Sequence, residues 1–265
     1  MDSNPALTRQ VWGLWRRIFD QNSGSDMSIH FGRSLRSLFC TPPRLPRVSG
    51  RVLVFGSAPS PHVSSELVSM ATIVTANASQ LTLERYGVAC PHITFMRPNM
   101  WDDRATSKMK REALGDRRTG LLAVEAPKDD PKCDRLLAAL REVNYRFDEL
   151  LILDRLESCV VQTRMLHPRS SSLVRKYDLS MGLRAILTCL AMGADELAVS
   201  GISLKSDGCS FSDLSYQRKH KEADRQILNR IRHLGLPVFP ADRELAAESG
   251  LSPWQPHQEA RSAVT

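Results

Sequence analysis

The chain has 265 residues, of which 42% are hydrophobic, 25% charged and 6% aromatic. This composition is that of a globular protein, and it excludes a collagen-like, low-complexity or wholly disordered chain. The length suggests one large domain or two small ones, and one large α/β domain fits it. The 36 Lys and Arg residues against 29 Asp and Glu give a formal charge of +7, which favours a polyanionic partner: nucleic acid, anionic lipid or a phosphate-bearing substrate.

Arginines concentrate in residues 1–50, which we predict to form a basic N-terminal arm. Seven arginines and three aspartates give this segment a net charge of +4. Apolar residues between positions 11 and 19 recur at helical spacing and predict an amphipathic helix. Such a helix either lies on an anionic membrane surface or packs its apolar stripe on the domain. The proline-rich residues 40–47 predict an extended linker after it.

From residue 51 onward, short apolar runs alternate with helical patterns. The expected strands are residues 51–56, 71–76, 92–96, 121–125, 150–154, 196–201 and 236–239, and the expected helices are residues 62–70, 132–142, 180–192 and 213–234. This alternation predicts an α/β fold: a single Rossmann-like domain with a mostly parallel sheet and helices on both faces. We expect the domain to span residues 51–245, followed by a C-terminal tail, residues 246–265.

The cysteines and the apolar runs indicate in which part of the cell the protein resides. The six cysteines are scattered and contain no C-x-x-C pair, so a zinc ribbon or a thioredoxin-type site is not expected. Cysteines within apolar runs are typical of reduced thiols in the cytosol. No apolar stretch approaches the roughly 20 residues that span a bilayer, and the N-terminus lacks a signal-peptide core. We therefore expect a cytoplasmic protein, either free or attached peripherally to the inner face of the membrane.

In open parallel sheets, ligands bind beyond the carboxyl ends of the strands, near the point where the strand order reverses. The first expected strand ends in the small turn Gly56, Ser57, Ala58, Pro59 and Ser60. Backbone N–H groups of such a turn can hold a phosphate, although the same turn also suits a plain strand-to-helix connection. It matches neither G-x-G-x-x-G nor the P-loop pattern, which argues against a dinucleotide oxidoreductase or a P-loop kinase.

Other strand ends carry polar residues with two interpretations each. Asn77 follows the second strand, where its amide can contact a base or ribose edge or can serve as a turn residue or helix cap. Lys205 follows the strand at 196–201 and either neutralises a phosphate or is a solvated loop lysine. Asp102 and Asp103 can hold a metal-bound nucleotide, but we favour a solvated loop.

His220 is the candidate general base. It lies near the start of a basic helix, and Asp224 follows at i+4 on the same face, where a carboxylate can orient an imidazole. The neighbouring Arg218, Lys219 and Lys221 would attract an anionic substrate. A surface histidine on a charged helix is the alternative. No histidine forms a cluster with Cys, Asp or Glu at ligand spacing, so the sequence predicts no metal site.

These motifs resemble a known family. Residues 52–60 look like the first-strand motif of bacterial CMP-sialic-acid sialyltransferases with a single Rossmann-like domain, and like that of the 6-hydroxymethylpterin diphosphokinase-like family. Asn77 matches the second-strand asparagine of the sialyltransferases. Residues 180–202 resemble their [ST]-[ST]-G helix followed by L-G-x-x-x-I-x-L-x-G-x-D, and His220 falls where they carry the catalytic histidine. The resemblance covers roughly residues 51–235.

The resemblance implies an inverting glycosyltransferase that uses a nucleotide-activated, CMP-linked acidic sugar in surface polysaccharide or lipooligosaccharide synthesis. It implies that His220 takes the proton of the acceptor hydroxyl. The residues implied to hold the nucleotide, the sugar and the departing phosphate are Gly56, Ser57, Ala58, Pro59, Ser60, Asn77, Ser180, Gly182 and Lys205. The implied partners are a nucleotide-sugar donor and a glycan or glycolipid acceptor. An anionic membrane surface is a further candidate partner, no cofactor is expected, and the oligomeric state stays open.

The sequence also departs from the family pattern. Ser57 stands where the family has asparagine, Ser203 where it has an acidic residue, and Lys205 and Phe211 replace a pair of tyrosines. One alternative is a pterin diphosphokinase-like enzyme, although the missing carboxylate at Ser203 removes a ligand that its Mg²⁺ chemistry needs. Another alternative is a non-catalytic relative that binds a glycan or nucleotide. A nucleic-acid binder is disfavoured because no recognition motif or aromatic stacking platform is present.

Overall fold

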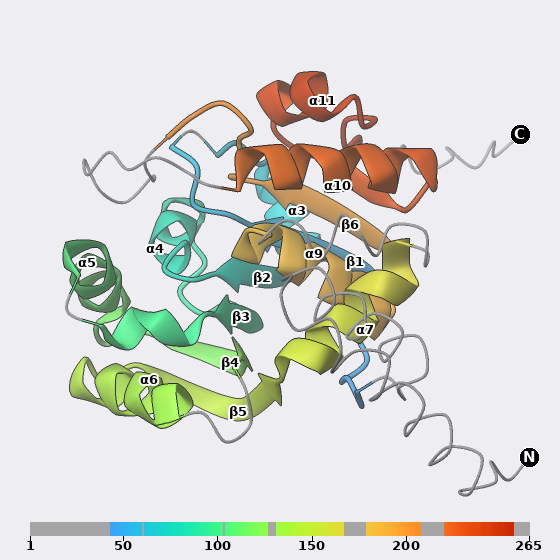
Figure 1. Ribbon diagram of the computed structural model, residues 1–265. Helices are drawn as coiled ribbons and strands as arrows, with labels where there is room; N and C mark the ends of the chain where they lie inside the picture. The colour runs from blue at the N-terminus through green and yellow to red at the C-terminus, as the bar shows by residue number, and fades with distance from the viewer. Residues whose placement is uncertain are drawn as a thin grey trace, which may run out of the picture.

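The computed structural model describes residues 43–59, 61–102, 104–126, 131–166, 179–207 and 220–256 (Figure 1). The predicted amphipathic helix, Ser60, Asp103 and residues 213–219 of the last predicted helix lie outside the described residues. The described residues form one parallel sheet in the order β5-β4-β3-β2-β1-β6-β7. Its strands are β1 (Arg51–Phe55), β2 (Thr72–Ala76), β3 (Ile93–Met96), β4 (Arg118–Glu125), β5 (Arg146–Leu153), β6 (Glu196–Ser200) and β7 (Val238–Pro240).

The strand order reverses between β1 and β6. The chain builds the sheet outward from β1 to β5 and then returns to place β6 on the other side of β1. Val54 in the middle of β1 is therefore in register with Val74 of β2 on one side and with Val199 of β6 on the other. A reversal of this kind opens a crevice at the carboxyl ends of the two strands, which is where open α/β sheets bind ligands.

Three helices cover one face of the sheet: α7 (Arg155–Leu166), α9 (Met181–Met192) and α10 (Lys221–His233) (Figure 1). Val52 and Val54 of β1 point to this face and join its core. Helix α9 is the most buried of the three, and burial raises the pKa of its Cys189 thiol to about 12, so this thiol is protonated. The glycine that ends α9, Gly193, has φ +101 and donates its N–H to the last turn, as a helix C-cap does.

The opposite face is covered by α3 (Ser65–Met70), α4 (Gln80–Leu83), α5 (Ala105–Leu114) and α6 (Pro131–Glu142). Leu53 and Phe55, which alternate with the valines of β1, pack here against Leu67 of α3. Farther along the sheet, Leu122 of β4 packs in a second apolar cluster with Leu136 of α6. The prediction of an α/β fold with helices on both faces of a parallel sheet is confirmed.

The remaining elements are short. The 3-10 helices η1 (Glu84–Tyr86) and η2 (Pro98–Trp101) follow α4 and β3, and α11 (Arg243–Ser249) follows β7. The sequence did not predict α5, α7 or α11, because polar side chains interrupt their apolar spacing. Strands β4 and β5 begin three to four residues earlier than predicted, at Arg118 and Arg146, because polar residues open both strands.

The ends of the domain are tied to the same core. Val48 donates its N–H to Met192 O at 3.0 Å, and Leu251, beyond α11, is buried. Helix α11 continues across the boundary predicted after residue 245. The division into an arm, a domain and a tail stays a prediction. No helix in the described part of the chain is long and apolar enough to span a bilayer.

Candidate functional site at the carboxyl ends of β1 and β6

The turns that follow β1 and β6 are in direct contact through two glycines. Gly56 donates its N–H to Ser200 O at 2.8 Å, and Ala58 donates its N–H to Gly201 O at 2.7 Å. A Cβ on Gly56 would lie 2.2 Å from Gly201 O, and a Cβ on Gly201, which has φ +68, would lie 2.5 Å from Gly56 O. Only glycine fits at either position, so the two turns approach each other as closely as backbones can.

This contact corrects part of the sequence interpretation. The N–H groups of this turn were candidates to hold a phosphate, but those of Gly56 and Ala58 donate within the protein. Pro59 is exposed and has no N–H. Ser57 is half-buried, and neither its N–H nor its hydroxyl makes a hydrogen bond to any described residue. Among the described residues of this turn, Ser57 is therefore the one whose N–H and hydroxyl can still meet a ligand.

Asn77 lies beside that turn, at the end of β2. It has φ +56, a left-handed conformation that asparagine tolerates better than most residues, and it donates its N–H to Phe95 O at 2.7 Å. The hydroxyl of Ser79, two residues later, donates to Phe55 O at 2.7 Å. Ser79 thereby ties the end of β2 to the end of β1, next to Gly56.

The N-terminus of α9 meets the same edge of the sheet. Ser180 caps α9, because its hydroxyl accepts the N–H of Leu183 at 3.3 Å, and its own N–H donates to Asp224 Oδ1 at 3.1 Å. Asp224 is fully buried in the first turn of α10. A Cβ on Gly182 would lie 2.8 Å from the Ile202 side chain, so Gly182 provides close packing against the loop after β6. These contacts join α9, α10 and the β6 loop.

The start of α10 contacts the loop after β6 through Lys221. His220 is half-buried and immediately precedes α10, and its carbonyl accepts the N–H of Asp224 at 2.8 Å. The ammonium of Lys221 donates to Lys205 O and lies 2.8 Å from Asp207 Oδ1. The side chain of Lys205 is 74% exposed, with its ammonium 3.4 Å from Glu248 Oε1. The loop after β6 and the start of α10 are thus held next to each other.

Ser203, where the family pattern has an acidic residue, shapes this loop. It is buried, and its hydroxyl accepts the N–H of Ser206 at 2.9 Å and the N–H of Lys205 at 3.2 Å. The serine therefore fixes the course of the backbone around Lys205.

Two arginines that the sequence did not single out also reach the N-terminus of α9. Arg97, directly after β3, donates to Leu179 O, and Arg184 Nε donates to the same carbonyl at 3.2 Å. Arg184 also pairs with Glu125 at the end of β4, and both side chains are at least 85% buried. In the sequence, these residues could have been found only by their position, because Arg97 follows one predicted strand and Glu125 ends another.

Asp242 is a further group that sequence reasoning missed. Its Oδ1 accepts the N–H of His62 at 2.6 Å and the hydroxyl of Ser200 at 2.9 Å, and its Oδ2 accepts the N–H of Gly201 at 2.7 Å. Burial raises the pKa of Asp242, and these hydrogen bonds to the ionised form oppose that rise. Nothing local in the sequence marks this residue, because its partners are 41, 42 and 180 positions away.

Asp102 does not join the site. Its Oδ2 lies 3.0 Å from Arg104 Nε, in an ion pair between neighbours in the chain. Asp103 lies outside the described residues. Across the described ranges, no three His, Cys, Asp or Glu side chains are grouped as a metal site would require.

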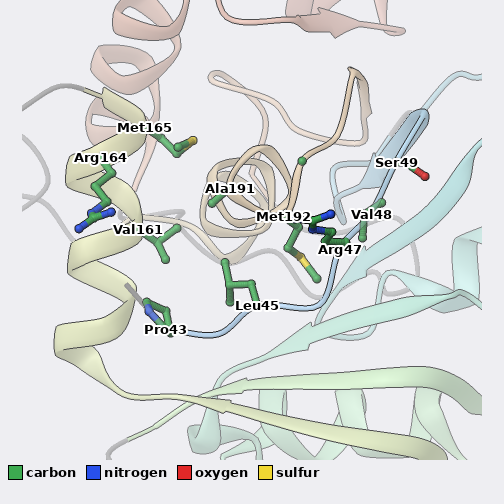
Figure 2. Close-up of a pocket in the computed structure, with 11 residues that line it drawn as sticks. Pro43, Leu45, Arg47, Val48, Ser49, Val161, Arg164, Met165, Ala191 and Met192 are labelled. Carbon is green, nitrogen blue, oxygen red and sulfur yellow. The ribbon is translucent and has the colours of Figure 1, made fainter. Parts of the chain in front are cut away.

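A pocket of about 510 Å³ lies elsewhere, at the C-terminal end of α9 (Figure 2). Leu45 lies between Val161 of α7 and Met192 of α9 in this pocket. Ser180 stands at the other end of the twelve-residue helix α9, roughly 18 Å away along the helix axis. The pocket is therefore separate from the residues described above.

No protein-family model matches the chain, and no curated protein matches it. Among solved structures, the chain is similar to the sialyltransferase CstII from Campylobacter jejuni in complex with the substrate analogue CMP-3FNeuAc, at 12% identity and a TM-score of 0.46, over 77% of this chain and 85% of that chain. It is also similar to the monofunctional α-2,3-sialyltransferase Cst-I from Campylobacter jejuni, at 11% identity and a TM-score of 0.49, over 80% of this chain and 84% of that chain.

Proposed function

We propose that the chain is an inverting glycosyltransferase whose donor is a CMP-linked acidic sugar, such as sialic acid or Kdo. The acceptor is a glycan or glycolipid of a surface polysaccharide or lipooligosaccharide, met in the cytoplasm or at the inner face of the membrane. The observation that carries this proposal is the convergence of the turns after β1 and β6, the N-termini of α9 and α10, and Lys205 beside the strand-order reversal.

The charges of this region suit an anionic donor. Helix α9 has twelve residues, and its N-terminus carries a partial positive charge that favours phosphate or carboxylate. Arg97 adds a guanidinium at the same helix end, and Lys205 an exposed ammonium. Ser57 and Asn77, on neighbouring strand ends, would hold the nucleotide, and Ser180 and Gly182 would line the sugar site.

In the proposed reaction, His220 takes the proton of the acceptor hydroxyl as its oxygen attacks the anomeric carbon of the donor sugar. The bond between that carbon and the phosphate oxygen of CMP breaks, and its electron pair leaves with CMP. Lys205, whose ammonium lies 3.4 Å from Glu248 Oε1, would neutralise the departing phosphate. A positioned base of this kind contributes about 10²–10⁴-fold to the rate.

Thermal unfolding in the presence of CMP, UMP, GDP and ATP tests the proposal. A nucleotide at 100 times its dissociation constant stabilises the folded state by about 2.7 kcal/mol, which raises Tm by several degrees in a protein of this size. We expect this shift with CMP and little change with the other three. A shift that requires ATP and Mg²⁺ would favour the pterin diphosphokinase-like alternative. CMP binding without transfer to any acceptor would favour the non-catalytic relative.

A further inference from the structure

We infer that Asp242, together with Glu248, positions the turns after β1 and β6 for nucleotide binding. This inference rests on the proposed function and adds positioning residues to its site. Both carboxylates belong to the α11 region, which contributes no residue to the proposed reaction. We call Asp242 and Glu248 the positioning pair.

The Asp242 carboxylate points away from its own helix. Asp242 occupies the N-cap position of α11, where an aspartate ordinarily accepts an N–H of its own helix. It makes no such bond. Instead, its two oxygens accept hydrogen bonds from His62, Ser200 and Gly201. The carboxylate therefore holds two separate turns rather than its own helix.

The two turns held by Asp242 are also bonded to each other in the candidate site. Gly201 N–H points to Asp242, while Gly201 O accepts the N–H of Ala58 in the turn after β1. His62 lies four residues beyond Ala58, and its N–H is also held by Asp242. Asp242 therefore holds the turn after β6 at Gly201, and it holds the segment after β1 at His62. Ser57, whose N–H and hydroxyl make no hydrogen bond to a described residue, directly precedes Ala58, which Gly201 O holds.

Glu248 contacts the same loop after β6. Its side chain is only 3% exposed, its Oε2 accepts the N–H of Leu204 at 2.9 Å, and its Oε1 lies 3.4 Å from the ammonium of Lys205. One short helix therefore places two buried carboxylates along residues 201–205. Asp242 sets the start of that loop, and Glu248 sets the position of the lysine proposed to meet the phosphate.

The chemistry at Asp242 specifically requires a carboxylate. Its two oxygens accept three hydrogen bonds, whereas an asparagine has one oxygen and an NH₂ group that only donates. In Asp242→Asn, the NH₂ would face either the N–H of Gly201 or the N–H of His62. One turn would lose its partner while the size of the side chain stays the same.

Calorimetric titration with CMP at 15 °C tests the inference on folded protein, with folding of each variant checked by circular dichroism. We expect Asp242→Asn to raise the Kd for CMP by on the order of 10-fold, because one of the two turns loses the hydrogen bond that holds it in place. Ser200→Ala removes one hydrogen bond to Asp242 and should raise the Kd by about 2- to 10-fold.

Two controls separate positioning from stability. Glu244→Gln changes an exposed carboxylate on α11 and should leave the Kd for CMP unchanged. Leu136→Ala destabilises the apolar cluster under β4 and should lower Tm without changing the Kd. A merely structural role for Asp242 would make Asp242→Asn behave like Leu136→Ala, with a lower Tm and an unchanged Kd.

The outcomes distinguish this inference from the proposed function. Wild-type protein that fails to bind CMP would overturn both. Wild-type protein that binds CMP, with unchanged Kd values in Asp242→Asn and Ser200→Ala, would overturn the positioning role alone. If Asp242→Asn does not fold, Ser200→Ala decides the question: a raised Kd supports the positioning role, and a wild-type Kd overturns it.

Discussion

The two halves of the sheet use polar groups in different ways. In the half formed by β2, β3, β4 and β5, the hydroxyl of Tyr145 donates to Gln80 Oε1 at 3.1 Å, and the hydroxyls of Thr75, Thr94 and Thr119 are linked in a chain of contacts. All of these groups are buried, and burial raises the pKa of Tyr145. This polar network is closed, because its members bond to each other away from solvent.

In the half formed by β1, β6 and β7, buried polar groups instead hold backbone turns that reach the surface. Asp242, Asp224 and Glu248 each accept a backbone N–H from a loop at the carboxyl edge. Ser57, which is half-buried, lies in the turn after β1, and Lys205, which is exposed, lies in the loop after β6. Under the proposed function, this difference means that one half of the sheet supplies stability, whereas the other positions groups for a ligand. Each prediction below tests that division.

The largest effect is expected for His220→Ala. Loss of the proposed base should lower transfer by about 10²–10⁴-fold, while the Kd for CMP changes little. Release of CMP from CMP-sialic acid, with and without glycan acceptors, measures this. His233→Ala, at the exposed far end of α10, is the matched control and should retain transfer. Unchanged transfer in His220→Ala would contradict the assigned role.

Leu136→Ala should have the largest effect on stability. Leu136 is fully buried in the cluster under β4, so its truncation should lower the free energy of unfolding by about 2–5 kcal/mol. Urea denaturation measures the loss, and Met70→Ala, at a side chain that is 48% exposed, should change stability by less than about 0.5 kcal/mol. If Leu136→Ala weakened CMP binding in the folded state, the proposed division between the halves would be wrong.

Gly201→Ala should affect both stability and binding. Its Cβ would collide with Gly56 O at 2.5 Å, and alanine is strained at φ +68. Together these should cost on the order of 2–4 kcal/mol and separate the two turns. Gly235→Ala has the same kind of backbone, φ +61, but open space around its Cβ, and should cost about 1 kcal/mol. Equal losses in the two variants, measured by urea denaturation, would show that the contact between the turns is unimportant.

The smallest effects concern two ion pairs. Glu125→Ala removes the partner that joins β4 to Arg184 of α9, where both side chains are mostly buried, and should cost about 1–3 kcal/mol. Arg118→Ala removes the exposed pair with Asp148 on β5 and should cost less than about 1 kcal/mol. Urea denaturation of both variants compares them directly. A larger loss in Arg118→Ala would reverse the expected order.

Much of the fold was readable from the sequence because its signals are local. The apolar run at residues 51–56 and the glycine that ends it predicted β1 and its turn. The helix at residues 180–192 was predicted almost to the residue, since serine caps its start and glycine ends it. Helix α7 was missed because its polar and apolar residues do not separate into two faces.

The candidate site was only partly readable for a physical reason. The sequence itself determined that Gly56, Asn77 and Ser180 stand at ends of strands or helices, because capping and turn chemistry depend on neighbours in the chain. His220 was expected inside a helix beginning at residue 213, whereas α10 begins at Lys221. The tertiary structure alone decided that β6 lies beside β1, that Gly56 contacts Gly201, and that Asp242 holds the turn at His62. Hydrogen bonds between residues 41 to 180 positions apart depend on strand order, and no local pattern encodes that order.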